Sequence, residues 1–366
     1  MHVAIFGCGQ LARMLALAGW PMGIEFSFIA GANDDTRCVN GLGKITRLRD
    51  GQSPQQLFEE LEKPDVITVE KEAVDTKLLE ELSQFTTVAP NPKALWTIQH
   101  RGRQKTFLHQ HNIPTAPFVE ISGKQQLLEA AKSVGYPVVI KSSEEGYDGM
   151  HQWRIHSEAD AQAFIDGEDK LADAVVEKLV NFSFEASIIV ARNAKGEVSS
   201  YTPSENRHEK GTLAVSVTPS SSLNEELHDK LKDIANTLVT AFDYVGVLAI
   251  ECFIVDGKII VNELAPRVHN SGHWTQDGAI CSQFENHLRA ICGKPLGATT
   301  SLGHSAMINL LGCNAPEELA TQSNAHLHWY NKTLRDGRKM GHINFLYESS
   351  NTLQSDLEQN LQILNA

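Results

Sequence analysis

Residues 247–264, VLAIECFIVDGKIIVNEL, restrict the possible folds of this chain more than any other stretch. Two runs rich in β-branched residues flank Asp256-Gly257, a dipeptide typical of tight hairpin turns. A three-residue loop, Asp256 to Lys258, would place Glu251 opposite Glu263. Facing carboxylates repel unless something lies between them, and a hard divalent cation takes such oxygen ligands. We therefore predict a magnesium site on a β-hairpin, with Asn262 beside it.

A second interpretation of the same stretch stays open. A two-residue loop would place Glu251 opposite Asn262, and the hairpin would then present an ordinary solvated polar face.

The segment after the hairpin, Ala265–Ala279, is unusually polar and contains glycine. Groups of this kind following a metal hairpin suit an anion and a polar substrate. The polar and aromatic residues concerned are Arg267, His269, Asn270, Ser271, His273, Trp274 and Gln276.

The first ninety residues alternate strand and helix patterns, which predicts a parallel sheet covered on both faces. The expected strands are His2–Phe6, Glu25–Ala30 and Asp65–Glu70. The expected helices cover Gln10–Gly19, a segment beginning at Ser53-Pro54, and Asp75–Gln84.

Asn91-Pro92 is expected to open one long helix to about His111, and Ile113-Pro114 begins a new unit. The alternating segments Ala186–Ala191 and Val198–Tyr201 predict antiparallel strands. Further helices are expected at Lys124–Val134, about Asn224–Phe242 and Leu353–Leu364, and further strands at Pro137–Ser142, Gln152–Ile155 and Ala174–Val180.

Lys141 ends an apolar strand and precedes the glycine loop Gly146–Gly149. A lysine in this position can reach phosphate oxygens while backbone N–H groups close over them. Glu177 and Glu185 follow, and either could accept a hydrogen bond from a nucleobase or ribose, although such carboxylates are more often simply exposed.

The N-terminal pattern Gly7-x-Gly9 lies between a strand and a helix, where a dinucleotide-binding motif would lie. Asp34 and Asp35 follow at a distance suited to a ribose, so an NAD-dependent oxidoreductase is a competing hypothesis. Gln10 and Arg13 favour a smaller phosphorylated ligand instead, because any phosphate can use a helix N-terminus.

The net charge of −13 argues against a nucleic-acid partner. The six cysteines are scattered and form neither a disulfide framework nor a zinc motif. No apolar run is long enough to cross a bilayer, and the first residues lack the pattern of a signal peptide. We therefore expect a cytoplasmic enzyme of ordinary globular composition with no membrane association.

Several segments together resemble the N5-carboxyaminoimidazole ribonucleotide synthetase family of the ATP-grasp superfamily. The matching segments are GCGQLARM, GYDG, NELAPRVHNSGHWTQDGA, MINLLG, HLHWYNK and GRKMGHINF. The resemblance runs from residue 1 to about 346.

This resemblance implies an α/β and α+β ATP-grasp fold. The expected parts are a Rossmann-like pre-ATP-grasp sheet at 1–92, an ATP-grasp domain at 93–298 with a lid at about 113–180, and a small C-terminal domain at 299–366.

The resemblance also implies the reaction. The family uses MgATP to convert bicarbonate to carboxyphosphate and then carboxylates the amine of 5-aminoimidazole ribonucleotide, in purine biosynthesis. It implies a homodimer whose product passes to a partner mutase. Residues expected to hold ATP are Arg101, Lys141, Gly146, Gly149, Glu177, Lys178, Val180, Glu185, Asn262 and Glu263.

The resemblance assigns magnesium to Glu251 and Glu263. Catalytic groups around bicarbonate and its phosphorylated form would be Arg267, His269, Lys339 and, from the glycine loop, Tyr147. The ribonucleotide would contact Gln10, Glu72, Tyr147, Asp148, His273, Lys332 and Arg338.

The glycine loop departs from the family pattern. Glu145 stands where the family usually has glycine, and Met150-His151 replace a basic residue and glycine. An extra carboxylate and a missing cation should weaken the hold on substrate. A different ATP-grasp ligase stays possible, since it would share Glu251 and Glu263 without needing the cluster around Arg267.

Overall fold

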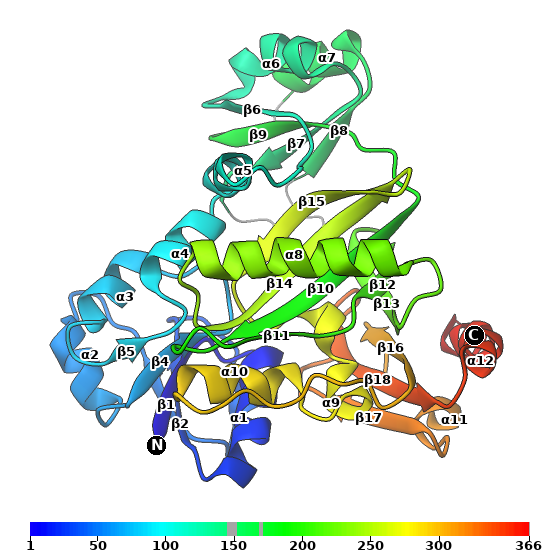
Figure 1. The fold of residues 1–366 in the computed structure, drawn as a ribbon. Helices are drawn as coiled ribbons and strands as arrows, with labels where there is room; N and C mark the ends of the chain where they lie inside the picture. The colour runs from blue at the N-terminus through cyan, green and yellow to red at the C-terminus, as the bar shows by residue number, and fades with distance from the viewer. Residues whose placement is uncertain (145–151, 168–170, 366) are drawn as a thin grey trace.

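The computed structural model describes residues 1–144, 152–167 and 171–365, and these residues form three sheets with their covering helices (Figure 1). A five-stranded sheet lies at the N-terminus, a four-stranded sheet stands at the top of the view, and a nine-stranded sheet connects the middle of the molecule to the C-terminus. Across the described ranges, no helix combines the length and apolarity that a bilayer-spanning segment requires.

The N-terminal sheet is parallel throughout, in the order β3-β2-β1-β4-β5, which confirms the predicted parallel sheet. Val3 and Ile5 face one apolar core and Ala4 and Phe6 the other, as expected of a strand covered on both sides. The strands are β1 (His2–Phe6), β2 (Glu25–Ala30), β3 (Lys44–Arg47), β4 (Val66–Val69) and β5 (Thr87–Val88). The helices are α1 (Gln10–Gly19), α2 (Pro54–Glu60) and α3 (Thr76–Leu82), with 3-10 turns at Trp20–Met22 and Arg37–Val39.

Two helices, α4 (Pro92–Ile98) and α5 (Arg101–Gln110), replace the single long helix that we predicted. The break occurs at His100, whose φ of −116° and ψ of 116° are extended. The imidazole of His100 accepts a hydrogen bond from the backbone N–H of Arg103 at 3.2 Å. Because this side chain caps a new helix, the chain can turn between the N-terminal sheet and the next unit.

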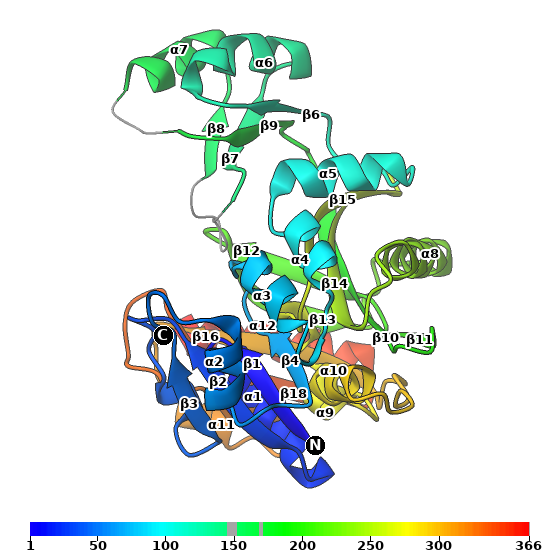
Figure 2. The same cartoon turned by 90° about the vertical axis from the view of Figure 1, so that its left-hand side faces the viewer.

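The lid sheet is antiparallel, in the order β6-β9-β7-β8, and α5 lies beneath it (Figure 2). Its strands are β6 (Phe118–Ile121), β7 (Val138–Ser142), β8 (Gln152–Ile155) and β9 (Ala174–Lys178). The helices α6 (Leu127–Val134), preceded by a 3-10 turn at Lys124–Gln126, and α7 (Glu158–Asp166) pack on its outer face.

The nine-stranded sheet follows the order β15-β14-β10-β12-β13-β16-β18-β17, with β11 paired to β10. The predicted antiparallel pairing of residues 186–191 with 198–201 is confirmed in β10 and β11. Neither β12 nor β13 was predicted. The strands are β10 (Phe184–Arg192), β11 (Val198–Ser200), β12 (Ser204–Glu209), β13 (Thr212–Thr218), β14 (Gly246–Val255), β15 (Lys258–Ala265), β16 (His304–Leu311), β17 (Ala325–Trp329) and β18 (Lys339–Tyr347).

Two helices cover opposite faces of this sheet. The apolar side of α8 (Glu225–Ala241) packs on it through Leu231 and Leu238, while α10 (Gln283–Ile291) packs between the sheet and α1. The N-terminal and nine-stranded sheets therefore share one apolar core. The remaining helices are α9 (Thr275–Gly278), α11 (Glu317–Ala320) and α12 (Ser350–Asn365), with a 3-10 turn at Asn270–Gly272.

Candidate active site

The predicted hairpin forms from β14 and β15, but its loop has two residues rather than three. Val255 pairs with Lys258, and the loop residues Asp256 and Gly257 have φ of 48° and 73°. Successive positive φ values characterise the type I′ turn, which Asp-Gly favours. The prediction of a three-residue loop is therefore wrong.

The two glutamates nevertheless face each other, because the ladder contains a β-bulge. Cys252 pairs with Val261, whereas Glu251 pairs with Glu263, so Asn262 is the extra residue. The bulge gives the two-residue turn the register that we had expected from a longer loop. The alternative in which Glu251 lies opposite Asn262 is thus excluded.

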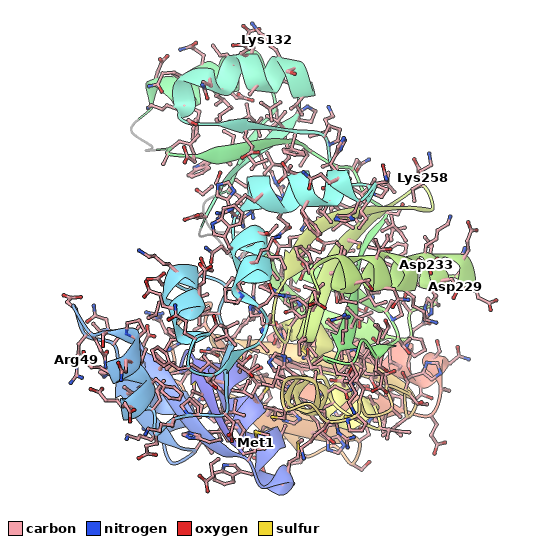
Figure 3. The ribbon with its side chains drawn as sticks, turned by 60° about the vertical axis from the view of Figure 1, so that its left-hand side comes forward. Met1, Arg49, Lys132, Asp229, Asp233 and Lys258 are labelled. Carbon is pink, nitrogen blue, oxygen red and sulfur yellow. The ribbon has the colours of Figure 1, made fainter. Side chains whose placement is uncertain are left out.

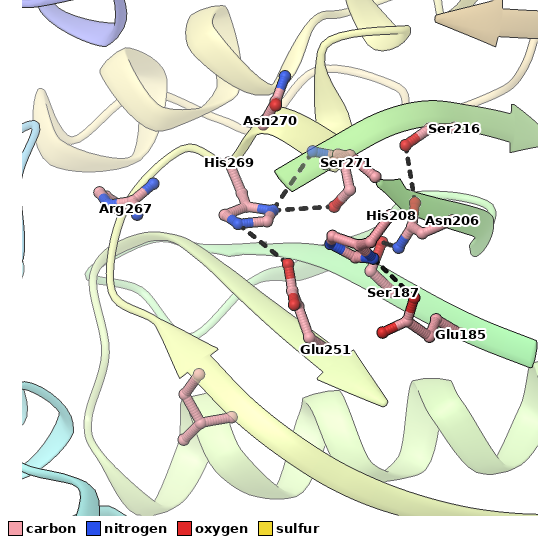
Figure 4. Close-up of polar contacts among 12 residues, drawn as sticks. Glu185, Ser187, Asn206, His208, Ser216, Glu251, Arg267, His269, Asn270 and Ser271 are labelled. Carbon is pink, nitrogen blue, oxygen red and sulfur yellow. Dashed lines mark hydrogen bonds and ion pairs between the residues drawn. The ribbon is translucent and has the colours of Figure 1, made fainter. Parts of the chain in front are cut away.

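Glu251 is a largely buried carboxylate, with its side chain 14% exposed and a neutral histidine beside it (Figure 4). Burial, reinforced by the charge of Glu263, raises the pKa of Glu251. His269 Nε2 lies 3.1 Å from Glu251 Oε1, and the Ser271 backbone N–H donates to His269 Nδ1 at 3.3 Å. Burial also holds the pKa of His269 well below its usual range. Because Nδ1 accepts, the neutral ring carries its proton on Nε2 and can donate it to Glu251.

A second carboxylate–histidine pair lies on the neighbouring strands. His208 Nδ1 is 2.7 Å from Glu185 Oε2. Burial alone would lower the pKa of His208, but the hydrogen bond to Glu185 and the negative charges of Glu251 and Glu185 together outweigh burial and raise this pKa. Sequence reasoning missed His208, because β12 was not predicted. The available signal was its two-residue spacing from Asn206, which would place both on one face of a strand.

A buried cluster of two lysines and one glutamate connects the lid sheet to the hairpin. Glu177 Oε2 on β9 accepts from Lys105 Nζ at 3.2 Å and from Lys141 Nζ at 3.3 Å. Lys141 Nζ also donates to Asn262 Oδ1, at 3.1 Å. Two predicted nucleotide residues, Lys141 and Glu177, therefore lie directly beside the predicted metal hairpin.

The other predicted nucleotide residues of the lid are placed around this cluster. Arg101 Nη1 donates to the carbonyl of Ser142 at 2.7 Å, directly after Lys141. The Lys178 side chain points elsewhere, since its ammonium donates to the carbonyls of Gly135 and Tyr136 at 2.8 and 2.7 Å. Of this residue, its backbone therefore stays as the group for the predicted ATP contact. Val180 is half-buried just beyond the end of β9.

Three predicted anion-binding side chains lie where loops of the N-terminal sheet meet the rest of the chain. Each is paired with an acceptor on that sheet's loops or on the first turn of α1. The pairs are Arg267–Glu72 at 2.7 Å, Lys332–Gln10 at 2.6 Å and Arg338–Asp35 at 3.1 Å.

Lys339 is the first residue of β18, and its charge acts on ionisable groups at the hairpin. Burial dominates the pKa shifts of both Glu251 and His269; the charge of Lys339 partly offsets the rise in the pKa of Glu251 and adds to the lowering of the pKa of His269. The structure thus groups predicted nucleotide and bicarbonate residues at the hairpin and predicted ribonucleotide residues beside the N-terminal sheet.

Three family models match the chain in succession. The ribonucleotide synthetase preATP-grasp domain matches residues 1–99, and the ATP-grasp domain matches 106–284. The phosphoribosylaminoimidazole carboxylase C-terminal domain matches 305–356.

Curated relatives extend over the same length. An N5-carboxyaminoimidazole ribonucleotide synthase from Pseudomonas aeruginosa is 39% identical over 362 residues, which cover 98% of each chain. The chain belongs to the N5-carboxyaminoimidazole ribonucleotide synthase family. Among solved structures, the synthetase from Thermus thermophilus is 38% identical with a TM-score of 0.89, over 99% of this chain and 97% of that one. The synthase from Aspergillus clavatus in complex with ADP and 5-aminoimidazole ribonucleotide is 28% identical with a TM-score of 0.89, over 100% and 98%.

In this synthase-family chain, the N-terminus of α1 is occupied by a carboxylate of the protein itself. Glu70 accepts hydrogen bonds from the backbone N–H groups of Gly9 and Ala12, the latter at 2.9 Å. A Cβ built on Gly7, whose φ is +118°, would overlap the Glu70 side chain. A dinucleotide pyrophosphate would need the same N–H groups. The oxidoreductase hypothesis is therefore wrong.

His273 lies behind the polar region. It is 1% exposed, its ring is 4.7 Å from that of His342, and Gln283 Nε2 lies 3.2 Å from its Nδ1. A side chain this deeply buried supports the loop from inside. The structure therefore does not place His273 for the direct ribonucleotide contact that we predicted.

The predicted glycine-loop residues Gly146, Tyr147, Asp148 and Gly149 lie outside the described residues, as do the family departures Glu145, Met150 and His151.

The donor set around the hairpin suits a cation that also binds nucleotide phosphates. Over the described ranges, no cluster of three or more His, Cys, Asp or Glu could enclose a metal by itself. Glu251 and Glu263 supply two facing carboxylates. Mg²⁺ commonly takes one or two protein carboxylates and fills its octahedron with phosphate oxygens and water. The residues present fit such a shared site.

Proposed function

We propose that this protein is an ATP-dependent ligase that carboxylates 5-aminoimidazole ribonucleotide to N5-carboxyaminoimidazole ribonucleotide in purine biosynthesis. The observation that carries this assignment is the facing pair of Glu251 and Glu263, joined through Asn262 and Lys141 to the buried lid cluster. The family matches, and the complex of a relative with ADP and the ribonucleotide, support the same reaction.

The nucleotide would lie between the lid sheet and the hairpin. The cations there are Lys141 near the end of β7 and Arg101 at the start of α5. Glu177 and Glu185 are the acceptors, on β9 and β10. Val180 and the backbone of Lys178 would line the same region. We propose Glu251 and Glu263 as the ligands of Mg²⁺, which when bound would neutralise charge on the phosphates and help transfer of the γ-phosphoryl group.

The reaction proceeds in two transfers. An oxygen of bicarbonate attacks the γ-phosphorus of ATP, the bond to the bridging oxygen breaks, and ADP leaves as carboxyphosphate forms. The exocyclic amine then attacks the carboxyl carbon, the bond to the phosphate oxygen breaks, and the nitrogen loses a proton as phosphate departs. Arg267, His269 and Lys339 would surround the small anion, since two are cations and the third is a neutral donor.

The ribonucleotide would lie in the region between the N-terminal sheet and β18. Lys332 and Arg338 are cations suited to its phosphate, with Gln10 and Glu72 as neighbouring polar groups. Tyr147 and Asp148 remain predicted contacts from the glycine loop. Because carboxyphosphate hydrolyses easily, a lid over this region would protect it from water.

Assembly and location are further proposals. We propose a homodimer in the cytoplasm that releases its product to a mutase acting on the carboxylated ribonucleotide. Two adjacent, well-exposed apolar side chains support a dimer contact: Ile280 is 60% exposed and Leu302 is 56% exposed. The segments that carry them are joined by the Leu302 N–H donating to the Gly278 carbonyl.

The decisive experiment measures ADP release with Mg²⁺ and bicarbonate, with and without 5-aminoimidazole ribonucleotide. We expect strong stimulation by the ribonucleotide in the wild-type protein. Glu263→Ala should lose at least about 100-fold in kcat, because the facing carboxylate pair is broken. Glu226→Ala is the control, since Glu226 is an exposed glutamate on α8 whose ion pair is with the exposed Lys230. ATP hydrolysis indifferent to the ribonucleotide would reject the substrate assignment.

A further inference from the structure

Lys105 is the most deeply buried charged side chain beside the proposed nucleotide site, and sequence reasoning assigned it no role. It lies on α5 and is 2% exposed. Its ammonium donates to Thr115 Oγ1 at 2.9 Å and contacts Glu177 Oε2 at 3.2 Å. A buried ammonium costs free energy unless such partners compensate for lost hydration.

Among the described residues, only one of the two carboxylate oxygens of Glu177 has a hydrogen-bond partner. Glu177 is 3% exposed, and its Oε2 takes both Lys105 and Lys141. Its Oε1 is buried and has no hydrogen-bond partner among the described residues. A buried carboxylate oxygen without a donor is costly, so it indicates a place for a donor supplied by a ligand.

Lys141 and Lys105 differ in the other groups that their ammonium groups can contact. Lys141 is the next-to-last residue of β7 and lies beside Asn262 of the hairpin, where its ammonium could contact nucleotide phosphates. Lys105 is enclosed between α5 and the lid, with its ammonium 5.8 Å from the centre of the Phe118 ring. It is therefore placed to contact Glu177 and not to contact phosphates. When Lys141 contacts a nucleotide, Lys105 is the cation that remains with Glu177.

The same ammonium connects α5 to the hairpin strand. Thr115 Oγ1, which accepts from Lys105, donates to the carbonyl of Val261 at 2.8 Å. Val261 immediately precedes the bulge residue Asn262. The ammonium of Lys105 therefore contacts Glu177 on the lid and, through Thr115, is also linked to the proposed metal hairpin.

We propose that Lys105 is a positioning residue for ATP: it binds Oε2 of Glu177 and leaves Oε1 to accept a hydrogen bond from an amino or hydroxyl group of the nucleoside. This inference rests on the proposed function, because it needs Glu177 to contact the nucleotide. Burial opposes ionisation of Glu177, but the charges of Lys141 and Lys105 outweigh it and lower the pKa of this carboxyl, so the acceptor is ionised.

A double-mutant cycle on MgADP affinity tests the proposal, using titration calorimetry on full-length protein. Lys105→Met should weaken MgADP about 10-fold, as expected for losing support of a charge-assisted hydrogen bond. Glu177→Gln should weaken it by a similar factor. In the Glu177→Gln background, Lys105→Met should add less than about 3-fold, because its target is gone.

The kinetic readout separates positioning from folding. The KM for ATP should rise in Lys105→Met while the KM for the ribonucleotide and kcat at saturating ATP change less than about 3-fold. Lys132→Met is the matched control. It removes an exposed, ion-paired lysine at the outer end of the same lid and should leave MgADP affinity unchanged (Figure 3).

Each alternative result has a defined meaning. Equal loss of affinity from Lys105→Met in both backgrounds would overturn the inference, as would a lower melting temperature with unchanged MgADP affinity. If Lys105→Met does not fold, Lys105→Gln, which keeps a donor for Thr115 or Glu177, takes its place in the cycle. Wild-type protein that binds no MgADP would overturn the proposed function itself, whereas binding without coupling would overturn only the role of Lys105.

Discussion

His287 is a buried imidazole that joins the N-terminal sheet to the nine-stranded sheet. Its Nδ1 accepts from the backbone N–H of Val247 at 3.1 Å, and its Nε2 lies 2.8 Å from Thr68 Oγ1. The ring is fully buried, and burial lowers its pKa from 6.5 to about 4. Because Nδ1 must accept, only the neutral ring fits these partners.

This residue should make the folded state sensitive to mild acid. A base whose pKa is lower when folded contributes stability that is complete above pH 6.5 and is lost as pH falls toward 4. At pH 5 the loss should be about 2 kcal/mol relative to pH 7.5. Urea unfolding of wild type and His287→Gln at both pH values measures it. The two proteins should differ less at pH 5, and an unchanged difference would contradict the assignment.

At the scale of elements, the β14–β15 hairpin combines a tight turn with a bulge, and each device has a different cause. Asp256-Gly257 closes the turn because both residues tolerate positive φ. The bulge at Asn262 then shifts the register by one residue and brings Glu263 opposite Glu251. Adding or removing one residue in the turn or at the bulge would turn Glu263 to the other face of the hairpin.

The turn can be tested apart from the site. Gly257 has φ of +73° and open space where a Cβ would lie, so Gly257→Ala adds backbone strain without a clash. We expect a loss of about 1 kcal/mol in unfolding free energy, with little change in kcat. Asp256→Asn is the matched control, because asparagine also tolerates positive φ, and it should be nearly neutral in the same denaturation experiment. Equal effects from the two changes would argue against the type I′ turn.

At the scale of the whole molecule, the proposed site exists only where three sheets meet. The lid sheet supplies Lys141 and Glu177, and the nine-stranded sheet supplies the hairpin. Loops of the N-terminal sheet and the first turn of α1 supply partners for Arg267, Lys332 and Arg338. The β16–β18 segment belongs to the same hydrogen-bonded sheet as the hairpin. The predicted boundary between 298 and 299 therefore falls in a connection within one sheet and stays a prediction.

The proposed dimer gives a prediction at this scale. Replacing Ile280 and Leu302 together by aspartate should place two charges in the contact and convert the dimer to a monomer in sedimentation velocity. Phe85→Asp is the control, because Phe85 is 41% exposed on the N-terminal part of the chain, on the segment that follows α3. A double variant that sediments like the wild type would exclude this surface as the contact.

The sequence by itself determined the elements whose signals are local. Strand patterns alternating with helix patterns predicted the parallel N-terminal sheet, and Asp-Gly between β-rich runs predicted the hairpin. Residue types and their order were also enough for the family, because the segment after the hairpin is so specific. These features follow from short-range periodicity and turn chemistry, which a chain carries wherever it lies in the fold.

Only the tertiary structure decided which side chains meet. The bulge at Asn262 depends on how β15 pairs with β14. The burial of His273 and the sharing of Glu177 by Lys105 and Lys141 depend on packing between distant segments. No local pattern encodes these contacts, because their energy comes from desolvation and pairing of groups tens of residues apart.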